Sequence, residues 1–184
     1  MELGNMSRLA TWVARSDEAL VAYVNRHWKC RVLDVLLPRF THLGGATATI
    51  GFLVAWYICL EEDTEMWALP GLLALGVSHL IVQILKWLLP RIRPHLKHEY
   101  LHAFPNSLTD YSFPSGHTTA AFAVATTFCL YDAMLIFLLI PIAIIVGYSR
   151  IYLALHYPTD VFIGSVIGSM TAYVFVEILP LLHL

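Results

Sequence analysis

Charged residues and cysteines are both scarce in this chain. Asp, Glu, Lys and Arg make up 13% of its 184 residues, whereas 58% of the residues are hydrophobic. Soluble globular domains carry about 25% charged and about 45–50% apolar residues, so this composition argues against a soluble domain and favours one embedded in a membrane. The net charge of −2 gives no indication of a nucleic-acid partner, and we expect none.

The three cysteines have neither the paired spacing of a disulfide framework nor the spacing of metal ligands. We interpret Cys30, Cys59 and Cys129 as small apolar residues. Repeats, low-complexity tracts and flexible linkers are also lacking, so we expect one membrane domain over residues 1–184. Residues 1–13 lack the features of a secretory signal peptide, and we expect internal apolar segments to direct insertion.

Five apolar segments predict an all-α fold, an integral membrane bundle of about five transmembrane helices. A helix needs about 20 mainly apolar residues to cross the hydrocarbon core. The first and third segments are short for this purpose and need flanking residues, whereas the other three are long enough. The segments comprise residues 43–60, 66–89, 115–130, 133–153 and 159–179, and acidic residues within 61–65 separate the first two.

Residues 1–42 precede the bundle and are predicted to form an amphipathic interfacial segment. Ser16 followed by Asp17 and Glu18 is typical of a helix start, and apolar residues that share one helical face follow it. Basic residues and Trp28 on the same stretch favour a helix that lies in the membrane interface. The alternative is a helix that packs on the bundle through its apolar face.

Gly164 and Gly168 form a Gly-x-x-x-Gly pattern in the last apolar segment. Small residues at this spacing let two helices approach closely. The pattern favours packing inside the bundle, with a dimer interface as the alternative, and the oligomeric state stays open.

Three short clusters near the ends of apolar segments carry the candidate chemistry. With five spans, residues 90–113 and residues 149–158 lie on the same side of the membrane, so the clusters meet at one face. The clusters are residues 86–94 (KWLLPRIRP), residues 114–117 (PSGH), and Ser149-Arg150 followed by His156 and Asp160.

The first cluster and Arg150 supply three cations at predicted helix ends. A charge is costly inside hydrocarbon, so cations at such positions are usually paired or functional. The guanidinium groups of Arg93 and Arg150 can each bind two phosphate oxygens, and Lys86 adds a point charge. We interpret the neighbouring Arg91 and Lys97 as anchors that reach the lipid headgroups.

The second cluster predicts a helix start that binds an anion. Ser115 is a favourable N-cap, and Gly116 allows a ligand to approach the backbone closely. Unpaired amide groups and the positive end of the helix dipole then face the preceding loop, which favours phosphate binding by Ser115, Gly116 and His117. An ordinary capped helix start is the alternative.

The third cluster contains the candidate nucleophile. Ser149 and His156 are two helical turns apart and share a face if the helix continues through both. Pro158 starts a new segment with Asp160 in its first turn. This carboxylate can accept a hydrogen bond from one imidazole nitrogen of His156 and leave the other nucleophilic. A structural His–Asp pair at a helix junction is the alternative.

Together the clusters resemble the signature of the type 2 phosphatidic acid phosphatase superfamily, in its membrane lipid phosphatase branch. The resemblance implies that His156 attacks phosphorus and forms a phosphohistidine, that Asp160 orients it, and that His117 protonates the leaving oxygen. It also implies that no metal or other cofactor is needed. The matching residues are Lys86-x6-Arg93-Pro94, Pro114-Ser115-Gly116-His117 and Ser149-Arg150-x5-His156-x3-Asp160. The implied phosphate-binding residues are Lys86, Arg93, Ser115, Gly116 and Arg150.

The implied activity is hydrolysis of a membrane lipid phosphate or polyprenyl pyrophosphate. Phosphatidylglycerol phosphate, phosphatidic acid and undecaprenyl pyrophosphate are the candidate substrates. A lipid-linked phosphotransferase with the same site and a lipid-binding protein without catalysis are alternatives. All 11 Lys and Arg residues lie in segments on the side of the clusters, and the positive-inside rule would make that side cytoplasmic. The resemblance implies the opposite, and we expect a multi-pass cell-membrane protein with its site on the extracytoplasmic face.

A second motif suggests a different enzyme. His98-Glu99-x-x-His102 matches the zinc-binding pattern of metalloproteases, and His95 adds another imidazole. That chemistry needs both histidines on one helix, whereas this pattern lies in a short segment between prolines. We expect no metal in this protein, and a membrane zinc metalloprotease is the alternative.

Overall fold

The computed structural model describes residues 2–59, 67–102, 109–178 and 181, with side chains described from residue 8 onward. These residues form helices and connecting loops without any strand, and the predicted all-α fold is confirmed. The acidic residues within 61–65 lie outside the described residues. The elements are α1 (Glu2–His27), α2 (Arg31–Phe40), η1 (Thr41–Gly44), α3 (Ala46–Cys59), α5 (Ala68–Leu88), α6 (Pro94–Lys97), α7 (Gly116–Tyr131), η2 (Ala133–Leu135), α8 (Ile136–Tyr152), α9 (Pro158–Tyr173) and η3 (Val174–Ile178).

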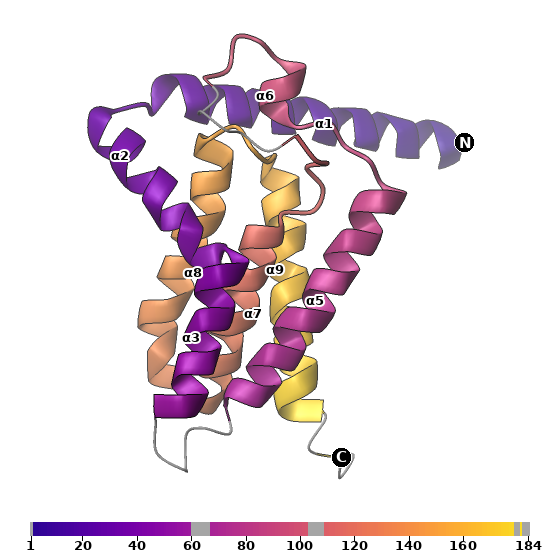
Figure 1. Cartoon of the computed structure of the whole chain (residues 1–184). Helices are drawn as coiled ribbons and strands as arrows, with labels where there is room; N and C mark the ends of the chain where they lie inside the picture. Colours follow the sequence, from indigo (N-terminus) through magenta and orange to yellow (C-terminus); the bar gives the residue numbers. More distant parts are fainter. Residues whose placement is uncertain (1, 60–66, 103–108, 179–180, 182–184) are drawn as a thin grey trace.

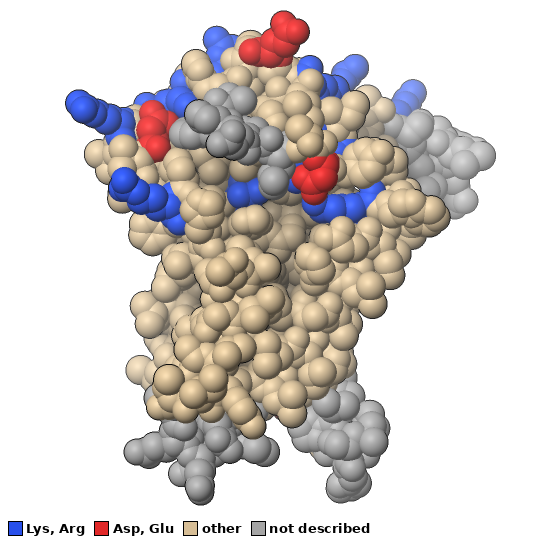
Figure 2. All heavy atoms as spheres, viewed as in Figure 1, with Lys and Arg blue, Asp and Glu red and all other residues tan. Residues whose placement is uncertain are grey.

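The helices α3, α5, α7, α8 and α9 run side by side as a bundle, and α1 crosses one end of it (Figure 1). In the bundle, α7 packs against α3, α5, α8 and α9. Figure 2 shows Lys, Arg, Asp and Glu gathered at the end where α1 lies, while other residue types form the rest of the described surface in that view. This separation of charge from apolar surface suits a protein whose α1 end lies at the membrane boundary.

Among the described residues, three helical segments are long and apolar enough to cross a membrane: Ala68–Leu88, Ala133–Tyr152 and Pro158–Glu177. The segments Arg31–Gly44 and Ala46–Cys59 form a bent pair, with an angle of 56° between them, that counts as a fourth span if both belong to one crossing. Although α7 lies among the other helices, it has only 16 residues. A multi-pass membrane protein is therefore supported, and the number of five crossings stays a prediction.

The predicted helix start at Ser16 is wrong, because α1 begins at Glu2 and continues past this position. Asp17 is instead buried and used for tertiary contacts. The predicted interfacial segment also breaks between α1 and α2. Val21 of α1 packs on the bundle against residues such as Tyr157, whereas Trp12 is exposed. One face of α1 thus packs on the bundle, and its location in the membrane interface stays a prediction.

The Gly-x-x-x-Gly pattern lies where α9 crosses α7. A Cβ atom at Gly164 or Gly168 would lie closer than 3.0 Å to the carbonyl oxygen of Ser115 or Thr119, respectively. The prediction that these glycines serve packing inside the bundle is confirmed. Their close approach holds the N-terminus of α7 against the first turns of α9, and both of these helix ends carry predicted site residues.

Candidate active site

A cavity of about 480 Å³ lies among η1, α3, α5, α7 and α8 and extends to the loop before α9. It brings together residues from all three sequence clusters, including both candidate imidazoles. Six of the eight predicted site residues line it: Lys86, Arg93, Gly116, His117, Arg150 and His156.

Arg150, in the last turn of α8, is a buried cation that forms no ion pair with any described residue. Its side chain is 2% exposed, and its Nη1 donates a hydrogen bond of 2.8 Å to Thr41 Oγ1 of η1. Within the described part of the chain, its Nε and Nη2 have no hydrogen-bond partner. An unpaired buried charge is costly, so this guanidinium is well suited to bind an anion in the cavity that it lines. Nothing in the sequence near Thr41 indicated this contact.

Arg93 is fully buried and connects the loop before α7 with the loop before α9. Its Nη1 lies 2.8 Å from the carbonyl oxygen of Leu155 and 3.0 Å from Nε2 of His156. Its Nε donates to the carbonyl oxygen of Asp110 at 2.8 Å, and its Nη2 pairs with the Asp110 carboxylate at 2.6 Å. All of these bonds are made by one planar guanidinium group. Arg93 therefore holds the His156 imidazole, the candidate nucleophile, in a fixed position relative to Asp110.

Asp110 bridges the two cations of the first cluster and was missed in the sequence. Its carboxylate pairs with Lys86 through one oxygen and with Arg93 through the other. Burial raises the pKa of Asp110, but the hydrogen bond from Lys86 and the charge of Arg93 outweigh this and lower it to about 2. Asp110 is thus an anion at neutral pH, and it occupies donors that the sequence assigns to phosphate. Its contacts are distant in sequence, so no local pattern distinguished it.

The helix that carries Arg150 stops before His156. Because α8 ends at Tyr152, Ser149 and His156 do not share a helical face as predicted, and the Ser149 hydroxyl donates to its own helix at the carbonyl oxygen of Val146. Ala154 then adopts a left-handed conformation, with φ of 53°, which costs a non-glycine residue about 1 kcal/mol. In this turn the amides of residues 155 and 156 donate to the carbonyl oxygen of Arg150. The His156 imidazole therefore lines the same cavity as the Arg150 guanidinium.

The imidazole of His156 is held in one tautomer by its two neighbours. Nδ1 lies 2.6 Å from the carbonyl oxygen of Ser112, which can only accept, so Nδ1 carries the proton. Nε2 then has the lone pair, which accepts from Arg93. Burial, with the charges of Arg150, Arg93 and Lys86, lowers the pKa of His156 well below 6.5. His156 is therefore neutral at pH 7 and nucleophilic at Nε2.

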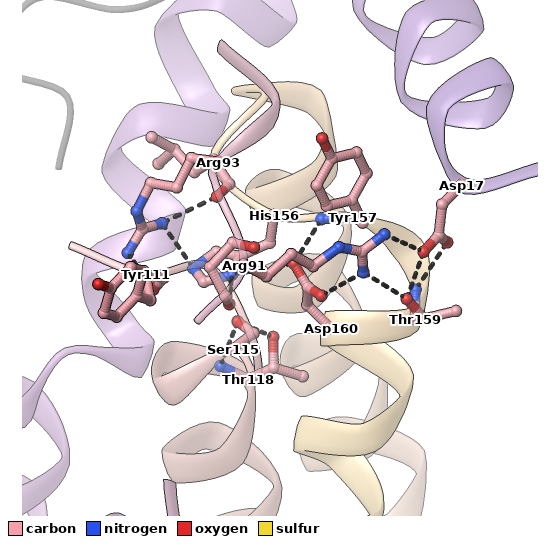
Figure 3. A network of polar contacts seen from close by, with 12 residues as sticks. Asp17, Arg91, Arg93, Tyr111, Ser115, Thr118, His156, Tyr157, Thr159 and Asp160 are labelled. Carbon is pink, nitrogen blue, oxygen red and sulfur yellow. Dashed lines mark hydrogen bonds and ion pairs between the residues drawn. The ribbon is translucent and has the colours of Figure 1, made fainter. Parts of the chain in front are cut away.

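Asp160 lies behind the imidazole, outside the cavity wall (Figure 3). Its Oδ2 is 3.7 Å from Nδ1 of His156, farther than the carbonyl oxygen of Ser112, and accepts from the amide of Tyr157 at 2.9 Å. The carboxylate thus forms the N-terminal cap of α9 while it stays close enough to stabilise positive charge on the imidazole. The orienting role of Asp160 remains a prediction.

Arg91 links Asp160 to α1 (Figure 3). Its Nη1 pairs with Asp160 at 2.7 Å and its Nη2 with Asp17 at 2.7 Å, and the guanidinium lies 3.8 Å from the centre of the Tyr157 ring. The interpretation of Arg91 as a headgroup anchor is therefore wrong, because its charge is used inside the protein. Lys97 also has a protein partner, Glu18 of α1, at 2.6 Å.

Ser115 is the N-cap of α7, as the sequence predicted, and its side chain is buried. Its hydroxyl pairs with the Thr118 hydroxyl at 2.8 Å, and its amide donates to the carbonyl oxygen of Asp160 at 3.0 Å. It does not line the cavity, whereas Gly116 and His117 do. Ser115 thus orients the start of α7, and its direct contact with phosphate stays a prediction.

The His-Glu-x-x-His motif does not lie on a helix. His98 is the C-cap of the four-residue α6, and the chain continues as a turn to His102. A zinc site of that type needs two imidazoles on one helical face. In the ranges that the structure describes, no group of three or more His, Cys, Asp or Glu residues is arranged to hold a metal ion.

Comparison with known proteins gives consistent matches. A family model described as the PAP2 superfamily matches residues 67–183. An undecaprenyl-diphosphatase of Sulfolobus acidocaldarius is 30% identical over 103 residues, which are 55% of this chain, and the chain spans half the length of that relative.

Two crystal structures are similar over most of both chains. That of Aquifex aeolicus LpxE matches with a TM-score of 0.78 at 29% identity, and covers 86% of this chain and 93% of that one. That of a transmembrane PAP2-type phosphatidylglycerolphosphate phosphatase from Bacillus subtilis matches with a TM-score of 0.74 at 26% identity, and covers 89% and 84%.

We predict that Asp110→Asn strengthens the binding of inorganic phosphate to the cavity. Asparagine keeps an oxygen that accepts from Arg93 but removes the charge that competes with phosphate for Lys86 and Arg93. An isothermal titration with phosphate in detergent should show a dissociation constant at least several-fold lower than that of the original protein, in line with about 1 kcal/mol for an ion pair of this kind.

Glu99→Gln is the matched control, because it removes the same charge from an exposed position that makes no ion pair with either cation. It should leave the dissociation constant within twofold. Equal effects of the two substitutions would show that only the net charge matters and would contradict the assigned role of Asp110.

Proposed function

The chain belongs to the PAP2 superfamily, and from this premise we propose that it is a membrane phosphatase that removes phosphate from a lipid phosphate or diphosphate. Its relatives are phosphatases by name, acting on undecaprenyl diphosphate or phosphatidylglycerolphosphate. One observation carries the proposal for this chain. The unpaired Nε and Nη2 of Arg150 and the lone-pair nitrogen of the neutral His156 belong to residues that line the same cavity.

In the proposed first step, the hydrogen bond from Arg93 to Nε2 of His156 is released. Nε2 then attacks phosphorus while the bond from phosphorus to the lipid oxygen breaks. His117, on the same cavity, donates a proton to the leaving oxygen, so the lipid departs as an alcohol or a monophosphate. The phosphoryl group stays on the imidazole as a phosphohistidine. Lys86, Arg93 and Arg150 stabilise the negative charge on its oxygens.

In the second step, water attacks the phosphohistidine and His117 accepts its proton, which releases inorganic phosphate and restores both imidazoles. The positive charge that His156 carries while it is phosphorylated lies 3.7 Å from the Asp160 carboxylate. Asp160 therefore supports catalysis by electrostatic stabilisation and by capping α9. For phosphate to reach Lys86 and Arg93, the Asp110 carboxylate has to move away from them.

The remaining cavity wall supports a lipid as the substrate. Away from the cations, the wall is formed largely by apolar side chains of α3 and α5, such as Ile50, Leu72 and Leu75. Ile50 and Gly76 are also exposed on the bundle surface, so the cavity reaches the surface that would face lipid. A substrate can then keep its tail in the bilayer while its phosphate reaches the site. Phosphatidylglycerol phosphate, phosphatidic acid and undecaprenyl pyrophosphate all have this form.

The test is to trap the phosphorylated enzyme. We expect the purified protein to release phosphate from lipid phosphates in mixed micelles, and His156→Gln to lower this rate by at least 10³-fold because the nucleophile is lost. With p-nitrophenyl phosphate, whose leaving group needs no acid, His117→Gln should still form an acid-labile phosphoprotein and accumulate it. A phosphoprotein that survives His156→Gln would contradict the assignment, and so would a His117→Gln variant that never becomes labelled.

The pH dependence provides a separate test. Because the pKa of His156 is lowered well below 6.5, its neutral form persists as pH falls through 6.5 and is lost only at lower pH. We therefore expect kcat/KM to keep its value between pH 7 and 6, apart from ionisation of the substrate. Measuring two substrates with different phosphate pKa values separates ionisation of the enzyme from ionisation of the substrate. If kcat/KM fell below pH 6.5 in the same way for both substrates, that would be inconsistent with a buried neutral His156.

We also propose that the protein lies in the cell membrane with its site on the extracytoplasmic face. Two exposed native cysteines report on this: Cys30 lies at the α1 end and Cys59 at the far end of α3. A membrane-impermeant maleimide added to intact cells should label the original protein and a Cys59→Ser variant but not Cys30→Ser. The reverse pattern would put the site in the cytoplasm.

A further inference from the structure

Two polar side chains on α5 take no part in the mechanism proposed above. Helix α5 spans Ala68–Leu88 and is one of the three segments apolar enough to cross the membrane. Before Lys86 its polar side chains are Ser78, which bonds to its own helix at the carbonyl oxygen of Leu75, and the pair His79 and Gln83. Polar side chains in such a segment are costly and usually mark a functional position.

His79 and Gln83 line the same cavity as the candidate catalytic residues. Their side chains are joined by a contact of 3.2 Å between the His79 Nε2 and the Gln83 Nε2. The spacing 79, 83 and 86 puts both residues on the face of α5 that carries Lys86. The contact between His79 and Gln83 uses one donor and one acceptor. The other polar atoms of the glutamine amide and of the imidazole can still form hydrogen bonds with a ligand.

The pair extends the polar part of the cavity towards the apolar end of α5. A helix rises 1.5 Å per residue, so Gln83 lies about 4.5 Å and His79 about 10 Å along the axis from Lys86. The wall near them is otherwise largely apolar and includes Leu75 and Val82. The cavity therefore has a polar strip about two helical turns long that starts at the phosphate site.

We propose that His79 and Gln83 form a second subsite, which binds the polar segment that connects the cleaved phosphate to the lipid tails. This inference rests on the proposed function. The length of the strip favours a glycerol-based lipid phosphate, in which glycerol and ester carbonyl oxygens continue the polar part of the molecule beyond phosphorus. A polyprenyl diphosphate matches the strip less well, since its hydrocarbon begins directly after the second phosphate and would lie against His79.

The experiment compares two phosphomonoesters that differ in this segment. Diacyl phosphatidic acid has glycerol and ester groups, whereas hexadecyl phosphate joins its phosphate directly to hydrocarbon. In the double variant His79→Leu/Gln83→Leu, we expect kcat/KM to fall about 10- to 50-fold for phosphatidic acid, as two lost hydrogen bonds predict, and to change less than threefold for hexadecyl phosphate. Inhibition by inorganic phosphate should be unchanged, which shows that the catalytic site is intact.

The matched control is Leu80→Ala/Ile84→Ala, on exposed positions of the same helix turns that do not line the cavity. It should keep the original ratio of the two kcat/KM values. If the double leucine variant does not fold, the single variants carry the test, each with a loss of about 3- to 10-fold for phosphatidic acid alone.

An equal loss for both substrates, or no loss for either, would overturn the second subsite while the proposed function stands. A protein that releases phosphate from neither substrate, nor from a polyprenyl diphosphate, would overturn the proposed function and with it this inference. The two failures are thus distinguishable by the activity of the original protein.

Discussion

The site depends on an excess of buried positive charge over negative charge. Arg150 has only the Thr41 hydroxyl as a hydrogen-bond partner in the described chain, and Arg93 and Lys86 share the single carboxylate of Asp110. Taking such charges out of water is costly when they are incompletely paired, so the arrangement gains most from a ligand with several negative oxygens. Together with burial, the same charges lower the pKa of His156, so the arrangement that suits an anionic ligand also keeps this imidazole neutral.

Backbone contacts help to build the scaffold that holds these charges. The glycines of α9 allow it to touch the backbone of α7, and the amide of Ser115 donates to the carbonyl oxygen of Asp160. His156 lies in the loop that leads into α9, and its imidazole is held by the carbonyl oxygen of Ser112. Backbone groups thus fix the relative placement of α7 and α9, and the Arg93 guanidinium adds the side-chain bonds that hold the His156 imidazole.

Local patterns in the sequence predicted much of this arrangement. The cap at Ser115, the start of α9 at Pro158 and the internal packing of Gly164 and Gly168 follow from rules that involve only near neighbours. The end of α8 before His156 could not be predicted from such rules, because alanine has no preference for the left-handed conformation. Ala154 is held in that conformation by its burial and by the hydrogen bond from the His95 amide to its carbonyl oxygen.

The partners of the cations could not be predicted, because they are distant in sequence. Thr41 lies more than 100 residues before Arg150, and Asp17 lies 74 residues before Arg91. The local sequence around Asp110 is that of an ordinary acidic loop residue, and only the fold shows that it pairs with Lys86 and Arg93. A cation at a membrane boundary has the same local sequence whether it contacts lipid headgroups or another helix, so only the fold distinguishes the two.

Arg91 pairs with both Asp17 of α1 and Asp160 of α9, so α1 contributes one carboxylate to the ion pairs behind the His156 imidazole. Without α1, the Arg91 guanidinium would lose one of its two counterions, and the amide of Thr159 would lose its acceptor on Asp17. The crossing helix α1 thus belongs to the ion-pair network behind the imidazole, in which two carboxylates share one guanidinium. The position of Asp160 beside the imidazole is therefore shared between α9 and α1, and deleting α1 would loosen the start of α9 as well as expose the surface that α1 covers.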